Sequence, residues 1–277
     1  MRAVLIHSTI REDEKLLLAA AVSRRVNLAA VDIRRQILNL ETWRDRFDVV
    51  LERCVSATIG AHAVAFFESI GIPVVNSLSV ARICDDKFAT SLCLRKNRVP
   101  TIPFAMAFTE AEALEAVNQL GGYPVVLKPV GGSWGRLLAK VNDHDALEAV
   151  IEQKMILGSH SHKALYIQKY ILKPGRDIRV ITAGGQAVGA IYRAARHWIT
   201  NTARGAEAQS CRIDKKLEQI CADASRAIGG GVLGIDIFET GDGYVVNEIN
   251  RAAEFKNVQR VTGIDIAGAI IEYCINL

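Results

Sequence analysis

The chain has 277 residues, half of them hydrophobic, and a formal net charge of +4. This length favours two or three subdomains with buried cores, and the lack of a long polar run predicts an ordered globular protein. No stretch of about 18 uncharged apolar residues occurs, so neither a membrane span nor a signal peptide is expected, and the chain is predicted to be cytoplasmic. The modest charge and the lack of a recognised motif argue against nucleic-acid binding.

The six cysteines show no C-x-x-C spacing and lie mostly in apolar stretches. This pattern predicts reduced, buried thiols rather than a zinc site. Arginines crowd the N-terminal part of the chain, at residues 24–25, 34–35, 44 and 46. They fit either a basic face for an acidic partner or the solvated ends of helices.

The N-terminal region alternates strands and helices. Strands are predicted at residues 2–6, 26–33, 48–51 and 72–75, with helices at 11–24 and 61–70. This pattern predicts a small parallel sheet with helices on its faces. No G-x-G-x-x-G follows the first strand, so a dinucleotide fingerprint is missing. Because α/β sheets bind ligands at the carboxyl ends of their strands, Arg53 and Ser56 are candidate substrate contacts.

A second unit, of α+β type, begins with an edge strand at 103–106 and a helix at 109–119. The strand at 125–129 contains Lys128, and the glycine-rich stretch 131–136 separates it from a return strand at 137–141. Glycines let backbone N–H groups approach an anion, and the lysine adds a positive charge, so we expect the loop to fold over a triphosphate. The pattern is not a Walker A loop. An ordinary hairpin fits the same residues, although a lysine within a strand needs a partner.

A helix at 143–154 precedes strands at 165–171, 177–181 and 187–193, which we predict to form an antiparallel meander. Several polar side chains then crowd an irregular stretch: Arg193, Arg196, Asn201 and Arg204. Guanidinium groups suit phosphoryl transfer, in which charge develops on phosphoryl oxygens. The last predicted helices lie at 213–227 and 264–275. The predicted division of the chain is 1–86, 87–163 and 164–277.

The residues 234–238 and 244–250 form apolar strands around a Gly/Asp turn at 240–243, which is typical of a hairpin. Antiparallel pairing about this turn places Asp236 opposite Glu248, and alternation leaves Glu248 and Asn250 on one face. Two carboxylates and an amide oxygen suit Mg²⁺, which shares its ligand shell with substrate phosphates. Taken alone, the segment also fits a hairpin with solvated polar positions.

The chain resembles an ATP-grasp ligase along its whole length. The resemblance is carried, in chain order, by Lys87, Lys128 with its neighbours, the loop 131–136, the strand 168–171, Asp236 and the E-I-N run at 248–250. Among these enzymes it is most similar to the LysX-like ligases, which are related to RimK. The stretches that carry this closer match are LERCVS at 51–56, GSWGRLLAKV at 132–141, PGRDIRV at 174–180, HWITNTARG at 197–205 and EFKN at 254–257.

The resemblance implies an ATP-grasp fold preceded by a parallel α/β pre-ATP-grasp domain, and it implies ATP and Mg²⁺, the latter as two ions. Residues implied to bind the nucleotide are Lys87, Lys128, Gly132, Ser133, Trp134, Gly135, Gln168, Lys169, Ile171 and, at the ribose, Asp177. Residues implied to bind Mg²⁺ are Asp236, Glu248 and Asn250. Catalytic roles fall on Arg193, Asn201 and Arg204, and substrate contacts on Glu254, Phe255 and Asn257.

LysX-like ligases activate a carboxylate of the small acidic carrier protein LysW as an acyl phosphate, which the amino group of α-aminoadipate then attacks. The resemblance therefore implies lysine biosynthesis and, because family members are often tetramers or dimers, a homo-oligomer. Asn257 favours α-aminoadipate, since Gly-Phe accompanies glutamate in ArgX, the related arginine-pathway ligase, whereas Val258 departs from the LysX pattern. Lys169 replaces an expected acidic residue beside the adenine. The alternatives are an ArgX-like or RimK-like glutamate ligase, a LysX-like ligase of another pathway, and a non-catalytic nucleotide-binding docking protein.

Overall fold

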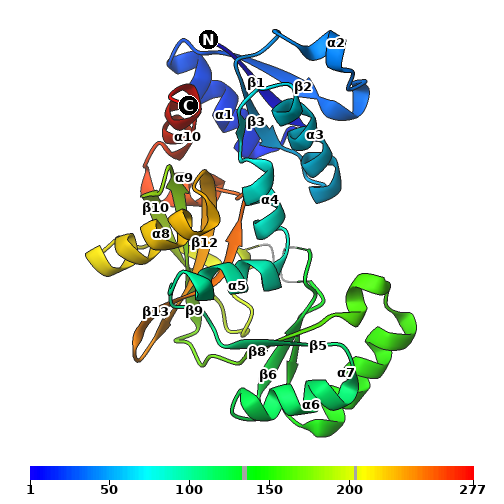
Figure 1. Ribbon diagram of the computed structural model, residues 1–277. Helices are drawn as coiled ribbons and strands as arrows, with labels where there is room; N and C mark the ends of the chain where they lie inside the picture. Colours follow the sequence, from blue (N-terminus) through cyan, green and yellow to red (C-terminus); the bar gives the residue numbers. More distant parts are fainter. Residues whose placement is uncertain (133–135, 203–204) are drawn as a thin grey trace.

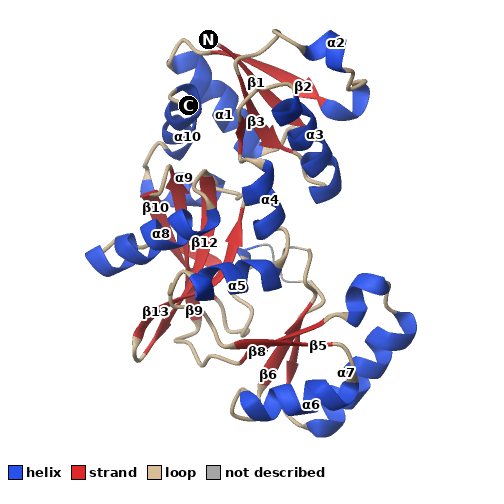
Figure 2. Cartoon of the chain, viewed as in Figure 1, coloured by secondary structure: helices blue, strands red, loops and turns tan. Residues whose placement is uncertain are grey.

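The computed structural model describes residues 1–132, 136–202 and 205–277, apart from the side chains of residues 160 and 161. These residues form three sheets, and the C-terminal sheet lies between the other two (Figure 1). Helices lie mainly on the outer sides of the sheets (Figure 2). None of the described helices is both long enough and apolar enough to cross a membrane.

The N-terminal sheet is parallel, with strand order β2-β1-β3-β4, as the alternation of strands and helices predicts. The central strands β1 and β3 are buried over nearly their whole length because helices cover both faces. The elements are β1 (Arg2–His7), α1 (Glu12–Ser23), β2 (Asn27–Asp32), η1 (Ile33–Arg35), α2 (Leu40–Trp43), β3 (Val49–Arg53), α3 (Ala57–Ser69) and β4 (Val74–Val75).

Two helices, α4 (Leu78–Cys84) and α5 (Lys87–Lys96), connect this sheet to the rest of the chain. Asp86 caps α5, because its carboxylate accepts hydrogen bonds from the backbone N–H groups of Phe88 and Ala89 at 2.8 and 2.9 Å. Lys87 is therefore the first residue of α5. Its own N–H donates to the carbonyl of Val130 at 2.8 Å, which holds the start of the helix against the glycine-rich loop.

The central sheet is antiparallel, with order β5-β8-β6-β7. Successive side chains of its strands point to opposite faces of the sheet. Val125, Leu127 and Ile167 pack into the core beneath α6 and α7, whereas Lys128 and Gln168 face a cleft. The elements are β5 (Phe104–Ala107), α6 (Glu110–Gln119), β6 (Val125–Lys128), β7 (Ala139–Val141), α7 (His144–Leu157), η2 (His160–Lys163) and β8 (Leu165–Lys169).

The predicted meander starting at residue 165 is wrong in its first strand. β8 pairs with β5 and β6, whereas β9 pairs antiparallel with β10 and β12 in the C-terminal sheet. Leu165 and Ile167 complete the apolar layer under α6 and α7, which decides the pairing. By its hydrogen bonds β8 lies with the central sheet, although the predicted division at residue 164 assigns it to the C-terminal unit.

The C-terminal sheet has the order β11-β10-β9-β12-β13. Its elements are β9 (Arg176–Ala183), β10 (Gln186–Ala194), β11 (Glu207–Ser210), α8 (Lys215–Ile228), β12 (Val232–Thr240), β13 (Gly243–Asn250), α9 (Lys256–Thr262) and α10 (Ile266–Ile275). Helix α8 buries an apolar face at Leu217, Ile220, Cys221, Ala224 and Ile228 against the sheet. It ends at Gly229, whose φ of 110° suits a glycine cap.

The N-terminal and C-terminal parts share one hydrophobic core. Leu5 and Leu17 of the first sheet pack in the same cluster as Ile181 and Ile266, and α10 lies beside α1 (Figure 1). Asn76 adds a polar joint: its amide donates to the carbonyl of Val232 at 2.7 Å and accepts from the N–H of the same residue at 2.6 Å. The N-terminal and C-terminal parts of the chain are therefore held together by apolar packing and by these two hydrogen bonds.

Candidate active site

The β12/β13 hairpin has the predicted register, with Asp236 paired directly with Glu248. The pairing shifts just beyond this pair, between Asp236 and Ile237, and Asn247 falls in the irregularity. Such a bulge breaks the strict alternation of side chains. Asn247 and Glu248 consequently line the same pocket, although they are neighbours in the strand.

Asp236 lies buried between two guanidinium groups. Arg179 Nε and Nη2 donate to its two carboxylate oxygens at 2.5 and 3.0 Å, and Arg193 Nη2 lies 3.1 Å from Oδ1. Burial alone would raise the pKa of Asp236, but the charges of Arg179 and Arg193 hold it below its usual value. The carboxylate is therefore ionised at neutral pH.

Arg193 connects Asp236 to a second buried acid, Asp177. Its Nε and Nη2 donate to the two oxygens of Asp177 at 2.7 and 2.8 Å. The hydroxyl of Thr200 donates to the same carboxylate at 2.6 Å, and Lys173 Nζ lies 3.7 Å away. Burial would lower the pKa of Arg193, but the two acids raise it above its usual value. Asp177 thus faces the cleft as part of a tightly bonded network.

Two lysines approach this hairpin from other elements. Lys128 Nζ, at the end of β6, donates to Asn247 Oδ1 at 2.8 Å, and burial lowers its pKa to about 8 while Glu248 acts in the opposite direction. Lys87 Nζ, at the start of α5, donates to the carbonyl of Gly132 at 2.5 Å and lies 3.6 Å from Glu248 Oε1. Both ammonium groups thus stand beside the acids, positioned for an anionic ligand.

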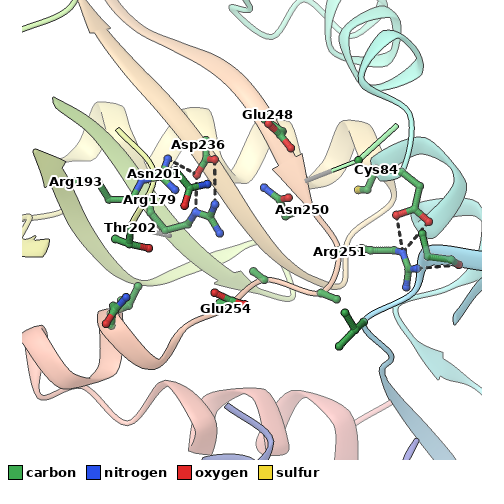
Figure 3. Close-up of a pocket in the computed structure, with 18 of the residues that line it drawn as sticks. Cys84, Arg179, Arg193, Asn201, Thr202, Asp236, Glu248, Asn250, Arg251 and Glu254 are labelled. Atoms are coloured by element: carbon green, nitrogen blue, oxygen red, sulfur yellow. Dashed lines mark hydrogen bonds and ion pairs between the residues drawn. The ribbon is translucent and has the colours of Figure 1, made fainter. Parts of the chain in front are cut away.

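The cleft has two compartments that meet at four shared residues: Arg193, Asn201, Asp236 and Glu248. Figure 3 shows the first compartment, with Asp236 among the arginines and Glu248 and Asn250 projecting beside it. Counting its open mouth, this compartment encloses about 1240 Å³, against about 650 Å³ for the second. The larger space suits more than one reactant, and the shared residues are those at which the reactants would meet.

The second compartment combines apolar walls with a charged end. The apolar side chains are Ile102, Val126, Leu138, Ile171, Ile199 and Phe238. Lys128 and Lys173 stand at the end shared with the acids, and Gln168 and Lys169 line the compartment from the end of β8. A flat aromatic base with an attached polyphosphate fits such a pocket.

The first compartment is lined by charged side chains from the N-terminal and C-terminal parts of the chain. Its arginines are Arg11, Arg179, Arg193 and Arg251, and its acids are Asp85, Asp236, Glu248 and Glu254. Asn250 and Asn257 add amide groups. This balance of charges suits substrates that carry both carboxylate and ammonium groups.

The family model of the RimK-like ATP-grasp domain matches residues 84–274, and that of the LysX preATP-grasp domain matches residues 3–83. The chain belongs to the RimK-like ATP-grasp family. It is therefore an ATP-grasp ligase that forms carbon–nitrogen bonds, and ATP-grasp ligases use ATP and Mg²⁺.

Two relatives extend over most or all of the chain. The α-aminoadipate–LysW ligase LysX of Saccharolobus solfataricus is 37% identical over 227 residues, which are 81% of this chain and 82% of the relative. The glutamate–LysW ligase ArgX of Sulfurisphaera tokodaii is 33% identical over 276 residues, or 99% and 98% of the two chains. Among solved structures, a RimK domain ATP-grasp protein from Sphaerobacter thermophilus has a TM-score of 0.82 at 27% identity, over 99% of this chain and all of that chain.

The predicted magnesium residues fit a shared ion. Among the described residues, no three His, Cys, Asp or Glu side chains lie close enough to hold a metal by themselves. Asp236, Glu248 and Asn250 instead line one compartment and offer two carboxylates and one amide oxygen. Mg²⁺ bound by few protein oxygens completes its shell with phosphate oxygens. The donor set of this ATP-grasp site therefore suits an ion that arrives with the nucleotide.

Three predicted substrate residues are not among those that line the two compartments. Arg53 is 3% exposed, and its guanidinium donates to Glu14 and to the carbonyl of Ala253. The hydroxyl of Ser56 caps helix α3, and Phe255 is 1% exposed in the core. The carboxyl end of β3 does reach the cleft, where Cys54, Val55 and Ala57 line the first compartment, but the side chains of Arg53 and Ser56 bond within the protein instead.

Some of the other predicted site residues line the first compartment, and others lie outside the residues that the structure describes. Glu254 and Asn257 line the first compartment, as do Gly132 and Asn201. The undescribed residues among the predicted nucleotide and catalytic contacts are Ser133, Trp134, Gly135 and Arg204.

Sequence reasoning missed Arg179, Asn247 and Arg251 as parts of the cleft. Arg179 had a usable signal, since it lies two residues from Asp177 in the same strand and so shares its face. Asn247 had no such signal, because the bulge that turns it toward the cleft is not visible in the alternation.

Proposed function

We propose that the enzyme joins the amino group of α-aminoadipate to the C-terminal glutamate side-chain carboxylate of a LysW-type carrier protein, through an acyl phosphate. The observation that carries this proposal is the two-compartment cleft, in which a nucleotide pocket and a charged substrate pocket meet at Asp236 and Glu248. The relatives named as LysW ligases support the choice of carrier.

In the first step, an oxygen of the carrier carboxylate attacks the γ-phosphorus of ATP, and the bond to the bridging oxygen of ADP breaks. The phosphoryl group is transferred where the two compartments meet. There Arg193 and Lys128 offset the negative charge that develops on the phosphoryl oxygens. We assign the adenine to the end of β8 and the residues after it, where Gln168, Lys169 and Ile171 line the second compartment. Mg²⁺, as one or two ions on Asp236, Glu248 and Asn250, would add further neutralisation of the phosphate oxygens.

In the second step, the neutral amino group of the incoming amino acid attacks the acyl carbon, the bond to the phosphate oxygen breaks, and the departing phosphate takes up the proton that the nitrogen loses as the amide forms. The first compartment supplies groups for both charges of an amino acid. Arg11 and Glu254, an ion pair of 3.1 Å with partly exposed side chains, offer a cation for a carboxylate and an anion for the ammonium group. No side-chain nucleophile is required, because the phosphate itself makes the carboxylate reactive.

The choice of α-aminoadipate rests on Asn257, which lines the first compartment beside Val258. Glutamate is the second candidate, because an ArgX relative is similar over 99% of the chain. The two substrates differ by one methylene, and such a difference in a pocket is worth about 1–3 kcal/mol. We expect the contacts that the substrate makes with Asn257 and Val258 to distinguish α-aminoadipate from glutamate.

The direct test measures ADP release by the purified enzyme with Mg-ATP, LysW and either amino acid. We expect turnover to require the carrier and to be about ten times more efficient with α-aminoadipate than with glutamate. A reversed preference would assign the enzyme to glutamate. If neither amino acid supports turnover, the proposed substrates are wrong, although the ATP-grasp assignment stands.

A further inference from the structure

One wall of the first compartment has no regular structure of its own. Residues 251–255 connect β13 to α9. Ala253 and Glu254 of this connection line the compartment, as does Asn257 in the first turn of α9. A segment outside a sheet or helix takes its position from its contacts with other elements. Here those contacts come largely from the other end of the chain, at the first turn of α1.

Asp13 makes the central contact. One oxygen of its carboxylate accepts hydrogen bonds from the backbone N–H groups of Phe255 at 2.6 Å and Lys256 at 2.9 Å. Asp13 is 1% exposed, and Phe255, the N-cap of α9, makes no side-chain cap of its own. A carboxylate from a distant helix thus replaces the missing cap and complements the positive end of α9.

Glu14 adds two indirect contacts through arginines. Its Oε1 accepts from Arg53 Nε at 3.0 Å and from Arg11 Nη2 at 3.1 Å. Arg53 Nη1 in turn donates to the carbonyl of Ala253, and Arg11 Nη1 donates to Glu254 Oε1, each at 3.1 Å. The acids of α1 therefore reach both the backbone and a side chain of the wall.

Glu12, the third acid in the first turn of α1, contributes little to holding this wall. Glu12 lies 3.5 Å from Lys256 Nζ, but its side chain is 61% exposed, so water screens the pair. Asp13 and Glu14 are buried, and their bonds are the ones that hold the wall.

We propose that Asp13 and Glu14 are positioning residues for the amino-acid substrate: the first turn of α1 holds the wall at 253–257 in the geometry that binds the incoming amine. The N-terminal domain thereby sets affinity for the amino acid without touching the nucleotide. The identity of that amino acid rests on the proposed function, whereas the contacts of the wall do not. A small displacement of such a wall lowers reactivity sharply, because attack needs close alignment.

Steady-state kinetics separate positioning from a merely structural role. Asp13→Ala leaves two N–H groups without their charged acceptor, and we expect KM for the amino acid to rise about tenfold while KM for ATP stays within about twofold. Asp13→Asn keeps an acceptor oxygen and should restore KM to within about threefold of the native value. Asp143→Ala, which removes the cap of α7 on the central domain, is the matched control and should leave KM for the amino acid unchanged.

Equal increases in both KM values, or no rescue by Asn, would show that Asp13 serves only the overall fold. If Asp13→Ala does not fold, Asp13→Ser gives the same comparison, because its hydroxyl fills part of the space but is too short to replace the carboxylate.

Amide hydrogen exchange provides a test that needs no substrate. In Asp13→Ala the amides of Phe255 and Lys256 should exchange at least about tenfold faster, while those of α8 keep their protection. Unchanged exchange at these two amides overturns the proposal. If the native enzyme shows no turnover with either amino acid, the proposed function fails, and faster exchange at the two amides still establishes that Asp13 holds the wall.

Discussion

Asp236 on β12 and Glu248 on β13 occupy paired positions, and both line both compartments of the cleft. Each carboxylate already faces its own cations: Asp236 contacts two guanidinium groups, whereas Glu248 lies 3.6 Å from Lys87 Nζ. A nucleotide with bound Mg²⁺ would bring both negative and positive charge to this point. The pair therefore marks where bound phosphates meet the substrate carboxylate.

Replacement of Lys128 by Met should abolish most of the turnover. The ammonium group stands at the charged end of the nucleotide compartment, and loss of one such electrostatic donor lowers kcat by about 10²–10³-fold. ADP release under saturating Mg-ATP measures the effect. Lys163→Met, at an exposed lysine of the same domain, is the control and should retain full activity. Near-normal kcat in Lys128→Met would remove the residue from phosphate neutralisation.

Asp236→Asn should raise the Mg²⁺ concentration required for activity. The amide keeps one oxygen but loses the charge that binds the ion and balances Arg179 and Arg193. We expect at least about a tenfold increase in the half-saturating Mg²⁺ concentration, from loss of a ligand worth about 1.4 kcal/mol or more. Asp242→Asn, at the exposed tip of the same hairpin, is the control. An unchanged Mg²⁺ titration in Asp236→Asn would contradict the metal assignment.

Glu14 should give the fold an acid-sensitive component. Burial would raise the pKa of Glu14, but hydrogen bonds from Arg11 and the charge of Arg53 hold it below the usual value. Its contribution to stability is therefore complete above the ordinary pKa and is lost as pH falls through the lowered one. Glu14→Gln should reduce the free energy of unfolding by about 1–3 kcal/mol at pH 7, and by progressively less below about pH 4.5.

Urea unfolding of both proteins from pH 7 down to pH 3 measures this difference. Glu41→Gln, at an exposed acid of α2, should follow the native curve throughout. A destabilisation that is constant with pH would mean that the charge of Glu14 is not what stabilises the contact.

Much of the fold was predictable because it depends on local patterns. The parallel N-terminal sheet follows from alternating strands and helices, and the Asp236–Glu248 register follows from one short turn. The partners of β8 were not predictable in this way, because β8 pairs with β5 and β6 and with neither of its neighbours in sequence, β7 and β9. The apolar side chains beneath α6 and α7 decide the pairing, and they are brought together only in the folded state.

The same distinction, between local sequence patterns and contacts formed only in the folded state, decides which site residues could be predicted. Lys128 and the hairpin acids stand out in the sequence because charged groups in buried strands need a function or a partner, whereas Lys87 was indicated only by the resemblance to ATP-grasp ligases. Asp13 does not stand out, since an acid in the first turn of a helix is common. Its contact with Phe255 joins positions 242 residues apart and exists only because α1 packs beside α9 and α10.

Arg251 offers a test of how the N-terminal and C-terminal parts of the chain are joined beside the cleft. It follows β13, forms an ion pair with Glu52 of β3, and donates from Nε to Asp85, just before α5, at 2.9 and 3.0 Å. The side chains of Arg251 and Glu52 are only 5% and 2% exposed. Arg251→Met would leave the Glu52 carboxylate buried without its cation, so we expect a loss of about 3–5 kcal/mol in the free energy of unfolding.

The double variant Glu52→Gln/Arg251→Met removes both charges and should recover most of that loss, because the penalty comes from the uncompensated acid rather than from the missing contact. Urea unfolding of the two single variants and the double variant gives the coupling energy directly. Arg226→Met, which breaks a surface pair in which the arginine is 74% exposed, is the control and should change stability by less than about 1 kcal/mol. Additive losses in the double variant would show that Glu52 and Arg251 stabilise the fold independently, in which case this pair would not be what joins the N-terminal sheet to the strand that carries Glu248.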